Sequence, residues 1–582
     1  MTCGSGGTDP SGGMGHETVP VCSTALAAYV VFLLVALVIY YDGFDTPFYY
    51  DSAAKLETRR HLFDQGLVSA LKMFPQRPLP ILTFYVNYLA FGTLSGYYRA
   101  VNAAILAASA VAASVLLFQI LTLPGIWSRG SPTGKKILSF ALGLLYLVHP
   151  LQVFVTLYVW QRMALMAGLF YLASLGTYLS VRSGRLRHEK FGYGMSLFLF
   201  ICAMLSKEIS VTLPVVLIMF ELAFFRPQWR DLCLRIAVYG AVLAAVFQVN
   251  SYLQHPHGEI NAPGGVLNTI SVYYAESGIT PERVLLTQAR VMFRYISMIL
   301  FPFPANIQLM SPQVVAYSLI DPPITLAAVG GAVALTAAGA ILIRRSPLGG
   351  VGILFLVVNL IPEALLAPQY SFFGYRAVLP MFGVLLVAAD CTRVLLESVR
   401  QSRAKRPVGA AICAGCIGLV ILLGLATNNK ALIWSDRVGF WTDTVQRFPP
   451  LSQAMETRSA AQAYSNLGWA LCFERRYAEA LRHLERAREI SPGQPAILAT
   501  LGYAYAKIGN PSRAEHFFEK AIALNPDLAF AHKELGLLLL REGRGGKARL
   551  HLQRALELAP YETSVRKILG RMPVPQGEPG GS

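Results

Sequence analysis

Charge is scarce in this sequence. Charged residues make up 14% of the 582 positions, whereas a soluble multidomain protein carries about 25%. Acids are the rarer sign, with 33 Asp and Glu against 50 Lys and Arg. Hydrophobic residues make up 54%, and the mean hydropathy is +0.47. These values exclude a wholly soluble protein and predict a chain built largely from membrane-spanning helices.

Patterned cysteines and metal ligands are also lacking. The eight cysteines give no disulfide framework. Cys202, Cys391, Cys413 and Cys416 lie in apolar segments, where a small thiol is ordinary packing, and Cys472 stands alone. No spacing of His, Cys or Asp resembles a metal site, and the need for a divalent ion stays open. The residues point to no certain cofactor.

Sixteen basic residues lie in five short loops between hydrophobic segments, and these loops alternate along the chain. They are Arg129, Lys135, Lys136, Arg182, Arg185, Arg187, Lys190, Arg226, Arg230, Arg235, Arg344, Arg345, Arg400, Arg403, Lys405 and Arg406. The alternation is the positive-inside pattern, so we expect these loops in the cytoplasm. A nucleic-acid-binding protein would gather such residues on one folded face, so no nucleic-acid partner is predicted.

Eleven hydrophobic segments are predicted to cross the membrane. They are 21–41, 98–121, 137–149, 162–181, 192–206, 210–225, 236–253, 321–343, 351–367, 376–395 and 408–427. The first covers roughly 31 Å, about one hydrocarbon core, and is expected to be an uncleaved anchor. An odd number of spans with cytoplasmic basic loops places the N-terminus inside and everything after Asn428 outside.

The same count places every polar stretch with candidate chemistry on the outer side. These stretches are the loop 42–97, the links 149–161 and 207–208, the long loop 254–320 and the link 368–376. We therefore expect any site that they form to open to one non-cytoplasmic face.

The first outer loop holds three acids within ten residues, Asp42, Asp45 and Asp51. Basic and aromatic residues follow, a combination that suits work on a lipid-borne phosphate or a sugar. We predict Asp51 as the centre of an active site. The alternative is a solvated acid, or an ion pair with Lys55 one helical turn on.

Beyond Trp434 a motif recurs with a period of 34 residues: a Leu-Gly pair, an alanine thirteen residues later and a closing proline. The pairs are Leu467–Gly468, Leu501–Gly502 and Leu535–Gly536, the alanines are Ala480, Ala514 and Ala548, and the prolines are Pro492, Pro526 and Pro560. This is the tetratricopeptide signature, in which small residues let paired helices pack closely. Three repeats are predicted, with Thr563–Arg571 as a capping helix.

The predicted fold is all-α, with a polytopic membrane domain of about eleven spans followed by an α-solenoid. The expected parts are a disordered tail at 1–20, a membrane domain at 21–430 with an outer catalytic loop at 42–97, a connector at 431–460, the repeats with their cap at 461–572 and a disordered tail at 573–582.

Four stretches carry a resemblance to a known family. RPLPILTFYVNYLAFG with YYRAVN (Arg77–Gly92, Tyr97–Asn102) resembles a stretch of TMTC-type membrane proteins with C-terminal tetratricopeptide repeats. HPLQVFVTLYVWQRMALMAGLFYL (His149–Leu172) resembles their bacterial relatives. LSKEISVTLP (Leu205–Pro214) and LIPEALLAPQYSFFGYRAVLP (Leu360–Pro380) resemble two further motifs, in the same order along the chain.

In the eukaryotic branch these proteins are protein O-mannosyltransferases of the GT-C superfamily, acting on the lumenal side. The resemblance implies a polyprenyl-phosphate sugar as donor substrate. The family's acidic pair aligns with Asp51 and Ser52, so the second acid is missing unless Asp45 replaces it. The family's Glu-His-Arg motif becomes Gly374-Tyr375-Arg376, which keeps the arginine and loses the acid.

Further polar residues are candidates for the same site. Arg162, Arg294 and Arg376 would bind the lipid phosphate, because a guanidinium fork matches phosphate oxygens, or would instead anchor at the interface. Lys207 joins this set, because charges at membrane depth tend to be functional, unless it simply pairs with its neighbour. The residues expected to line the site are Glu208, Arg77, His149, Gln161, Tyr98 and Asn102.

The preferred hypothesis is a GT-C-like glycosyltransferase that moves a sugar from a polyprenyl phosphate to an acceptor, expected to be a protein hydroxyl. Asp51 would be the base, with Asp45 as second catalytic candidate, and cations would stabilise the leaving phosphate. The groove of the repeats would hold an extended peptide on the same side. Expected partners are the lipid-linked sugar, the acceptor polypeptide and membrane lipids.

Two other classes of protein stay open. One is a non-catalytic membrane scaffold whose repeats recruit export or envelope proteins, which the missing second acid favours. The other is a transporter, which no internal duplication supports. We expect a bacterial inner membrane, with the N-terminus in the cytoplasm and the repeats in the periplasm. The endoplasmic reticulum is the alternative location.

Overall fold

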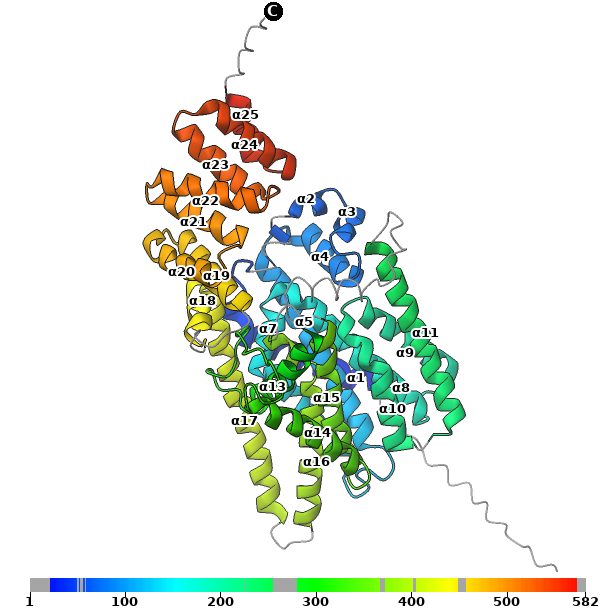
Figure 1. Ribbon diagram of the computed structural model, residues 1–582. Coiled ribbons are helices and arrows are strands. Elements are labelled where there is room, and N and C mark those ends of the chain that lie inside the picture. The colour runs from blue at the N-terminus through cyan, green and yellow to red at the C-terminus, as the bar shows by residue number, and fades with distance from the viewer. Residues whose placement is uncertain are drawn as a thin grey trace, which may run out of the picture.

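A computed structural model describes residues 21–49, 52, 56–57, 59–225, 227–254, 280–366, 372–400, 405–448 and 457–572. The regular elements of these residues are helices, apart from one isolated bridge between Met310 and Phe373. The predicted all-α fold is therefore observed in the described part of the chain. The N-terminal part is a bundle of long helices, and a curved stack of shorter helices stands at one end of it (Figure 1).

The bundle is built from long apolar helices joined by short ones. The long helices are α1 (Val21–Tyr40), α5 (Ser95–Leu121), α6 (Pro132–Val148), α8 (Arg162–Arg182), α9 (Glu189–Met204), α11 (Trp229–Gln254), α13 (Pro281–Leu300), α14 (Ile324–Leu342), α15 (Pro347–Leu366), α16 (Met381–Arg400) and α17 (Lys405–Ser435). The shorter ones are α2 (Arg60–Asp64), α3 (Leu67–Lys72), α4 (Pro78–Phe91), α7 (Val153–Thr156) and α10 (Leu213–Phe220), besides 3-10 turns at 41–43, 150–152, 159–161, 208–212 and 374–377 and a π-helix at 221–225.

By length and composition, eight stretches of the described residues could each cross a membrane. They are Thr24–Gly43, Ser95–Leu121, Val159–Arg182, Glu208–Phe225, Trp229–Asn250, Ile324–Leu342, Gly374–Val399 and Ala414–Ser435. A ninth is obtained if Pro132–Val148 and Pro150–Thr156, which meet at an angle of 50°, count as one span. Each coincides with one of the eleven predicted segments.

The difference from eleven arises at three helices: α6 and α9 are shorter than a straight span of about 20 residues, and α15 contains a proline, Pro362. Helix α6 breaks at His149, because the residue before Pro150 is driven out of the helical region. Helix α9 has 16 residues. The apolar part of α15 ends at Pro362. Hydropathy along the sequence identifies these apolar segments but does not show where each helix ends or bends.

Two buried acids of the bundle, Glu221 and Asp390, are paired with arginine. Glu221 is fully buried and accepts hydrogen bonds from Tyr178 Oη at 2.7 Å, Arg182 Nη2 at 3.0 Å and Arg235 Nη1 at 3.3 Å. Asp390 accepts from Arg393 Nη2 at 2.7 Å. These contacts satisfy two carboxylates that would be costly to bury alone.

The curved stack follows directly from α17. Helix α17 continues eight residues past the predicted end of its span at 427 and leads into α18 (Arg437–Gln446). Lys430 Nζ on α17 and Asp443 Oδ2 on α18 are 2.8 Å apart, which fixes the turn between the two helices. The apolar run of α17 ends at the predicted position, but the polar residues that follow it continue the same helix.

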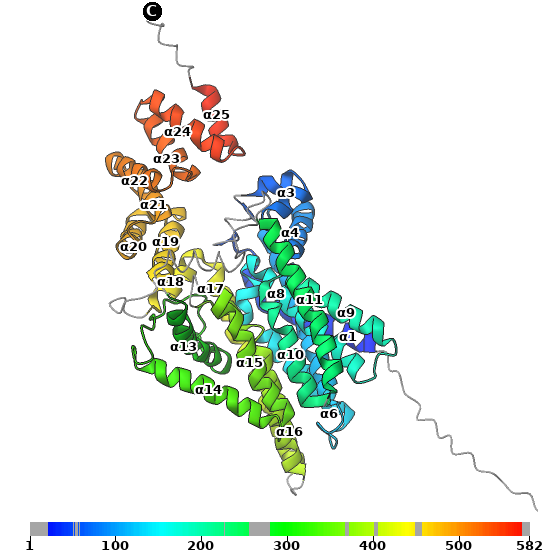
Figure 2. The ribbon, with the colours of Figure 1, turned by 45° about the vertical axis from the view of Figure 1, so that its right-hand side comes forward.

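The predicted repeats form three helix pairs and a terminal helix, stacked in chain order along an arc (Figure 2). The pairs are α19 (Thr457–Phe473) with α20 (Tyr477–Ile490), α21 (Pro495–Lys507) with α22 (Pro511–Leu524), and α23 (Ala529–Arg541) with α24 (Gly545–Leu558), and the terminal helix is α25 (Thr563–Arg571). We call α19 to α25 the solenoid.

The repeated glycines allow the two helices of each pair to touch. A Cβ atom built on Gly502 would lie 2.8 Å from the ring of Phe518, and one on Gly536 would lie 2.7 Å from Leu552 Cγ. Gly468 meets Leu484 in the same way at 2.5 Å. A side chain at these positions would push the helices apart, which explains the 34-residue spacing in physical terms.

Replacing Gly502 with valine is expected to destabilise the solenoid by about 1–3 kcal/mol, because the branched side chain overpacks against Phe518. Hydrogen exchange of α21 and α22 in the full chain measures the effect. Gly546→Val is the control, since nothing lies within 4 Å of a Cβ at Gly546. Equal protection in the two variants would show that the close approach does not stabilise the pair.

Two histidines meet between the helices of the third repeat. His532 Nδ1 and His551 Nδ1 are 3.0 Å apart, and His532 Nε2 lies 3.0 Å from the carbonyl oxygen of Pro526. Burial lowers the pKa of both imidazoles, and that of His551 is lowered further by His532. The folded repeat therefore favours the neutral form of both rings.

The third repeat is expected to lose stability on acidification. The unfolded chain takes up its protons near the ordinary histidine pKa of about 6.5, before the folded one does. The stabilisation from the two neutral rings is thus complete above pH 6.5 and is lost as the pH falls through the lowered pKa of the folded state. Hydrogen exchange of α23 and α24 at two pH values measures it. A His551→Gln variant with an unchanged pH dependence would contradict the assignment.

Candidate functional site

The predicted catalytic loop is described only in part, and Asp51 lies outside the described residues, as does Lys55. Asp45 is exposed, and its Oδ1 would lie 3.6 Å from a Cβ built on Gly96, at the start of α5. Asp42 is exposed and accepts a hydrogen bond from Asn428 Nδ2 at 3.1 Å. Asp45 therefore lies beside the start of α5, and Asp42 lies beside α17.

The described residues on either side of Asp51 are anchored to the bundle. Tyr49 donates a hydrogen bond to the carbonyl oxygen of Trp434 at 3.1 Å. Ser52 is buried, and its Oγ accepts from the backbone N–H of Trp160 at 3.0 Å. Trp160 directly precedes Gln161, a buried residue that was predicted to line the site.

Arg77 and Glu208 join the first loop to the turn before α10. Arg77 Nη2 lies 2.9 Å from Glu208 Oε1 and 2.8 Å from Oε2, and its Nε lies 3.2 Å from Oε1. Both side chains are partly exposed. Two residues predicted to line the site, 131 positions apart, therefore form one bidentate ion pair.

Arg162 is fully buried, with each nitrogen of its guanidinium committed to the protein. The acceptors are Asn102 Oδ1 at 2.6 Å, Asn87 Oδ1 at 2.7 Å, Thr83 Oγ1 at 3.1 Å and the carbonyl oxygen of Tyr98 at 2.9 Å. The guanidinium also lies 4.4 Å from the ring centroid of Phe84. This geometry makes Arg162 a clamp between α4, α5 and α8, and it brings Tyr98 and Asn102 together behind the loop.

Sequence reasoning missed a second buried arginine, Arg99. Its guanidinium donates to the carbonyl oxygens of Phe44 at 2.9 Å, Pro47 at 2.7 Å and Leu157 at 3.0 Å, and also to that of Thr46. It thereby holds the backbone of the first loop against the bundle. A charge near the start of an otherwise apolar helix was the available signal.

Three predicted phosphate ligands meet on the segment Phe372–Arg376. Lys207 Nζ lies 4.7 Å from the ring centroid of Tyr375. Arg294 lies 5.6 Å from the ring centroid of Phe372 and donates to Gln308 Oε1 at 3.0 Å, and Arg376 lies 5.6 Å from that of Phe373. We call Lys207, Arg294 and Arg376 the cation cluster.

Arg294 of the cation cluster has a buried donor that no described residue satisfies. Arg294 Nε is buried without a hydrogen-bond partner among the described residues. An unsatisfied buried donor costs free energy, so such a group is a natural point for a ligand oxygen. Arg162 lies outside this cluster, although the sequence placed it in the same set.

His149 orients two segments. Its Nδ1 accepts from the backbone N–H of Leu151 at 3.2 Å, so Nε2 carries the proton that faces the carbonyl oxygen of Ile299 at 3.1 Å. The ring links the break between α6 and α7 to the end of α13. Within the described ranges, no group of three or more His, Cys, Asp or Glu side chains is arranged to hold a metal ion.

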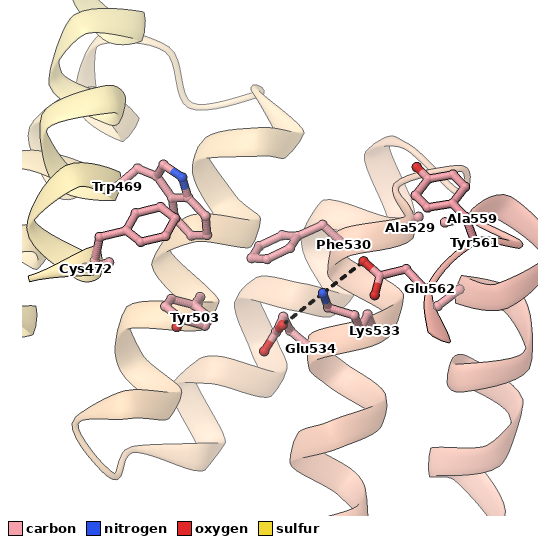
Figure 3. A pocket seen from close by; sticks show the side chains of 12 residues that line it. Trp469, Cys472, Tyr503, Ala529, Phe530, Lys533, Glu534, Ala559, Tyr561 and Glu562 are labelled. Carbon is pink, nitrogen blue, oxygen red and sulfur yellow. Dashed lines mark hydrogen bonds and ion pairs between the residues drawn. The ribbon is translucent and has the colours of Figure 1, made fainter. Parts of the chain in front are cut away.

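The solenoid contains a separate pocket of about 450 Å³. It is lined by Trp469, Cys472, Phe473, Tyr503, Ala529, Phe530, Lys533, Glu534, Ala555, Ala559, Tyr561 and Glu562. The ring centroid of Trp469 lies 5.5 Å from that of Tyr503 and 5.4 Å from that of Phe530. Figure 3 shows Trp469 and Tyr503 at one end of the pocket, Tyr561 at the other, and Phe530, Lys533 and Glu534 between them. We call this the solenoid pocket.

The solenoid touches the bundle at both ends of the solenoid pocket. At one end Arg437 lies 4.3 Å from the ring centroid of Phe473 and 5.5 Å from that of Tyr49. At the other end Tyr561 stacks on His61 of α2, with ring centroids 3.8 Å apart. The pocket therefore borders α2 at one end and α18 at the other.

Sequence reasoning did not single out this pocket. Its one local signal was periodic, since Trp469 and Tyr503 follow the repeated Leu-Gly pairs at the same position of consecutive repeats. Phe530 and Tyr561 have no such counterpart in the motif and are brought to the pocket only by the stacking of the helices.

Comparisons with known proteins identify the repeats. A family model described as a tetratricopeptide repeat matches residues 474–533. The tetratricopeptide repeat-containing protein trd-1 of Caenorhabditis elegans is 28% identical over 107 residues, which are 18% of this chain and 14% of that protein. A crystal structure of the APC/C hetero-tetramer Cut9–Hcn1 aligns over 88% of this chain and 94% of that one, at 15% identity and a TM-score of 0.22, a score too low to carry an argument.

The prediction of tetratricopeptide repeats is thus confirmed. The chain spans only 14% of the length of the worm relative, so nothing about that whole protein transfers here. The GT-C glycosyltransferase, the lipid-linked donor and the membrane location stay predictions.

Proposed function

We propose that this chain is a membrane-anchored tetratricopeptide protein that binds a partner polypeptide in the solenoid pocket and holds it against the first loop. The observation that carries the proposal is the position of the pocket. Its lining residues Phe473 and Tyr561 also contact Arg437 and His61 outside the repeats. A segment bound between them has the bundle as a neighbour.

Membrane anchoring is supported by the helices and by the placement of charge. Eight stretches are long and apolar enough to cross a bilayer, and the contacts of Arg182, Arg235 and Arg393 gather basic side chains at helix ends. By the positive-inside rule these ends face the cytoplasm. The solenoid then lies on the opposite side, which we propose to be the periplasm of a bacterium.

Site-specific photo-crosslinking in cells tests the binding function. A benzophenone amino acid placed at Phe530 in the pocket is expected to crosslink a partner polypeptide, whereas the same residue at Leu550, 67% exposed and outside the pocket, is not. The partner, identified by mass spectrometry and purified, should bind the Phe530→Ala chain at least about tenfold more weakly. Equal crosslinking at both positions, or unchanged affinity, would overturn the proposal.

A second candidate function is glycosyl transfer, favoured by the cation cluster. In such a reaction the acceptor hydroxyl oxygen attacks the anomeric carbon, its proton passes to Asp51, and the bond to the lipid phosphate breaks. Lys207, Arg294 and Arg376 would stabilise the departing phosphate. Ser52, the neighbour of Asp51 in sequence, packs at Trp160, and Tyr158 lies near Tyr375 with ring centroids 6.4 Å apart.

Under this second function the scaffold role is retained, because the solenoid would present the acceptor polypeptide. The comparisons support the repeats alone, so the binding function is the better supported of the two. The transfer reaction needs its own test, given in the Discussion.

A further inference from the structure

The solenoid pocket carries an excess of acid in a part of the chain that is otherwise basic. Between residues 457 and 572 there are 18 Lys and Arg against 11 Asp and Glu. The pocket reverses this balance, because its lining has two carboxylates, Glu534 and Glu562, and one ammonium, Lys533. The local charge therefore differs in sign from that of the surrounding surface.

Lys533 neutralises one of the two carboxylates better than the other. Its Nζ lies 3.3 Å from Glu562 Oε1 and 4.0 Å from Glu534 Oε1 (Figure 3). Burial raises the pKa of Glu534, even though Lys533, Lys507 and Arg541 act to lower it. The ionised Glu534 is thus left without full compensation inside the pocket.

The aromatic rings beside Glu534 offer faces that attract cations. Elsewhere in the same cluster the chain places its own cations on such faces, with Lys507 Nζ 5.0 Å from the ring centroid of Tyr503 and Arg437 4.3 Å from that of Phe473. Among the described residues no cation lies over the rings of Trp469 or Phe530. A cation within about 6 Å of a ring centroid is attracted by the negative face of the ring.

We propose that the solenoid pocket takes the side chain of an arginine or lysine from the partner polypeptide, with the rings of Trp469 and Phe530 beside the cation and Glu534 as its counter-charge. The inference rests on the binding function proposed above and names the chemistry that the pocket recognises. An acidic side chain would face Glu534 and Glu562, and a small apolar one would leave Glu534 uncompensated.

The ends of the pocket indicate how the rest of the partner segment lies. Tyr561 is stacked on His61 and Phe473 is covered by Arg437, so the pocket contacts α2 at one end and α18 at the other. A segment with its basic side chain in the pocket therefore has these two helices as neighbours.

A selection from random peptides displayed on phage tests this recognition. The full chain in detergent micelles is the bait, and the Phe530→Ala chain is used for subtraction. Selected peptides are expected to share an arginine or lysine at one position, and its replacement by glutamine should weaken binding at least about tenfold, measured by fluorescence anisotropy. Glu534→Gln in the protein should remove most of that difference.

The matched control is Glu557→Gln, an exposed acid of the third repeat outside the pocket, which should leave affinity and preference unchanged. Thermal unfolding of both variants verifies that they fold. Enriched peptides without a shared basic residue, or with one whose contribution survives in Glu534→Gln, would overturn this inference and leave the binding function standing. If no peptide prefers the wild-type chain to Phe530→Ala, the solenoid pocket is not a polypeptide site and both proposals fail.

Discussion

Replacing Arg162 with methionine is expected to lower the free energy of unfolding by about 3–5 kcal/mol, enough to deplete the folded protein. The substitution removes the arginine donor from Asn87 Oδ1, Asn102 Oδ1 and the carbonyl oxygen of Tyr98, and all three residues are buried. It also separates α8 from α4 and α5. Thermal unfolding and monodispersity of the detergent-extracted chain measure the effect.

Arg294→Met is the matched control. Arg294 is partly exposed and makes one hydrogen bond to a side chain, to Gln308 Oε1, so its loss should cost far less stability. The difference in stability between the two variants distinguishes an arginine that holds helices together from one that is available to bind a ligand. If the Arg162→Met chain folds as well as the Arg294→Met chain, the buried network around Arg162 does not hold the three helices together.

The contrast between these two arginines shows what sequence reasoning can and cannot resolve. A lone basic residue in an apolar stretch is visible in the sequence, and it indicates a special role without saying which one. Arg162 and Arg294 were therefore placed in one phosphate-binding set. Arg162 binds Asn102, 60 residues away in sequence, and Arg294 binds Gln308, 14 residues away. These partners are set by the packing of the folded chain.

The repeats were predictable almost residue by residue because their causes are local. A glycine that lets Phe518 approach, and a proline that ends a helix, act within one repeat of 34 residues. The terminal helix Thr563–Arg571 has the bounds that the sequence predicted. The solenoid pocket was not predictable in this way, since Trp469 and Tyr561 are brought together only by the curvature of the whole stack.

The meeting of the predicted outer loops was predictable in part, less than the repeats and more than the solenoid pocket. The alternating basic loops predict that 42–97, 149–161, 207–208, 254–320 and 368–376 share one side, and the structure joins residues of all five. Arg77 meets Glu208, His149 meets Ile299 and Lys207 meets Tyr375. Charge patterning predicts that these loops share one side, whereas the individual pairings are set by three-dimensional packing.

Replacing Asp51 with asparagine is expected to lower sugar transfer from a polyprenyl-phosphate donor by about 10²–10⁴-fold, if the chain is a transferase, because the acceptor hydroxyl loses its base. Transfer to envelope proteins is measured by mass spectrometry, or to a peptide in vesicles with a radiolabelled donor. Asp42→Asn is the matched control, since Asp42 is exposed, lies at the start of the loop and contacts Asn428. Crosslinking at Phe530 should persist in both variants.

The outcomes separate the two candidate functions only if the solenoid is removed without disturbing the loop. A cut at Asn428 would delete Trp434, whose carbonyl oxygen accepts from Tyr49, and Asp443, which pairs with Lys430. The cut therefore belongs after Phe448, beyond α18. Transfer that needs Asp51 and survives this cut assigns catalysis to the bundle and acceptor choice to the solenoid. If the wild-type chain shows no transfer and only the shortened chain has a phenotype, the transferase hypothesis is overturned. Polypeptide binding then remains as the function.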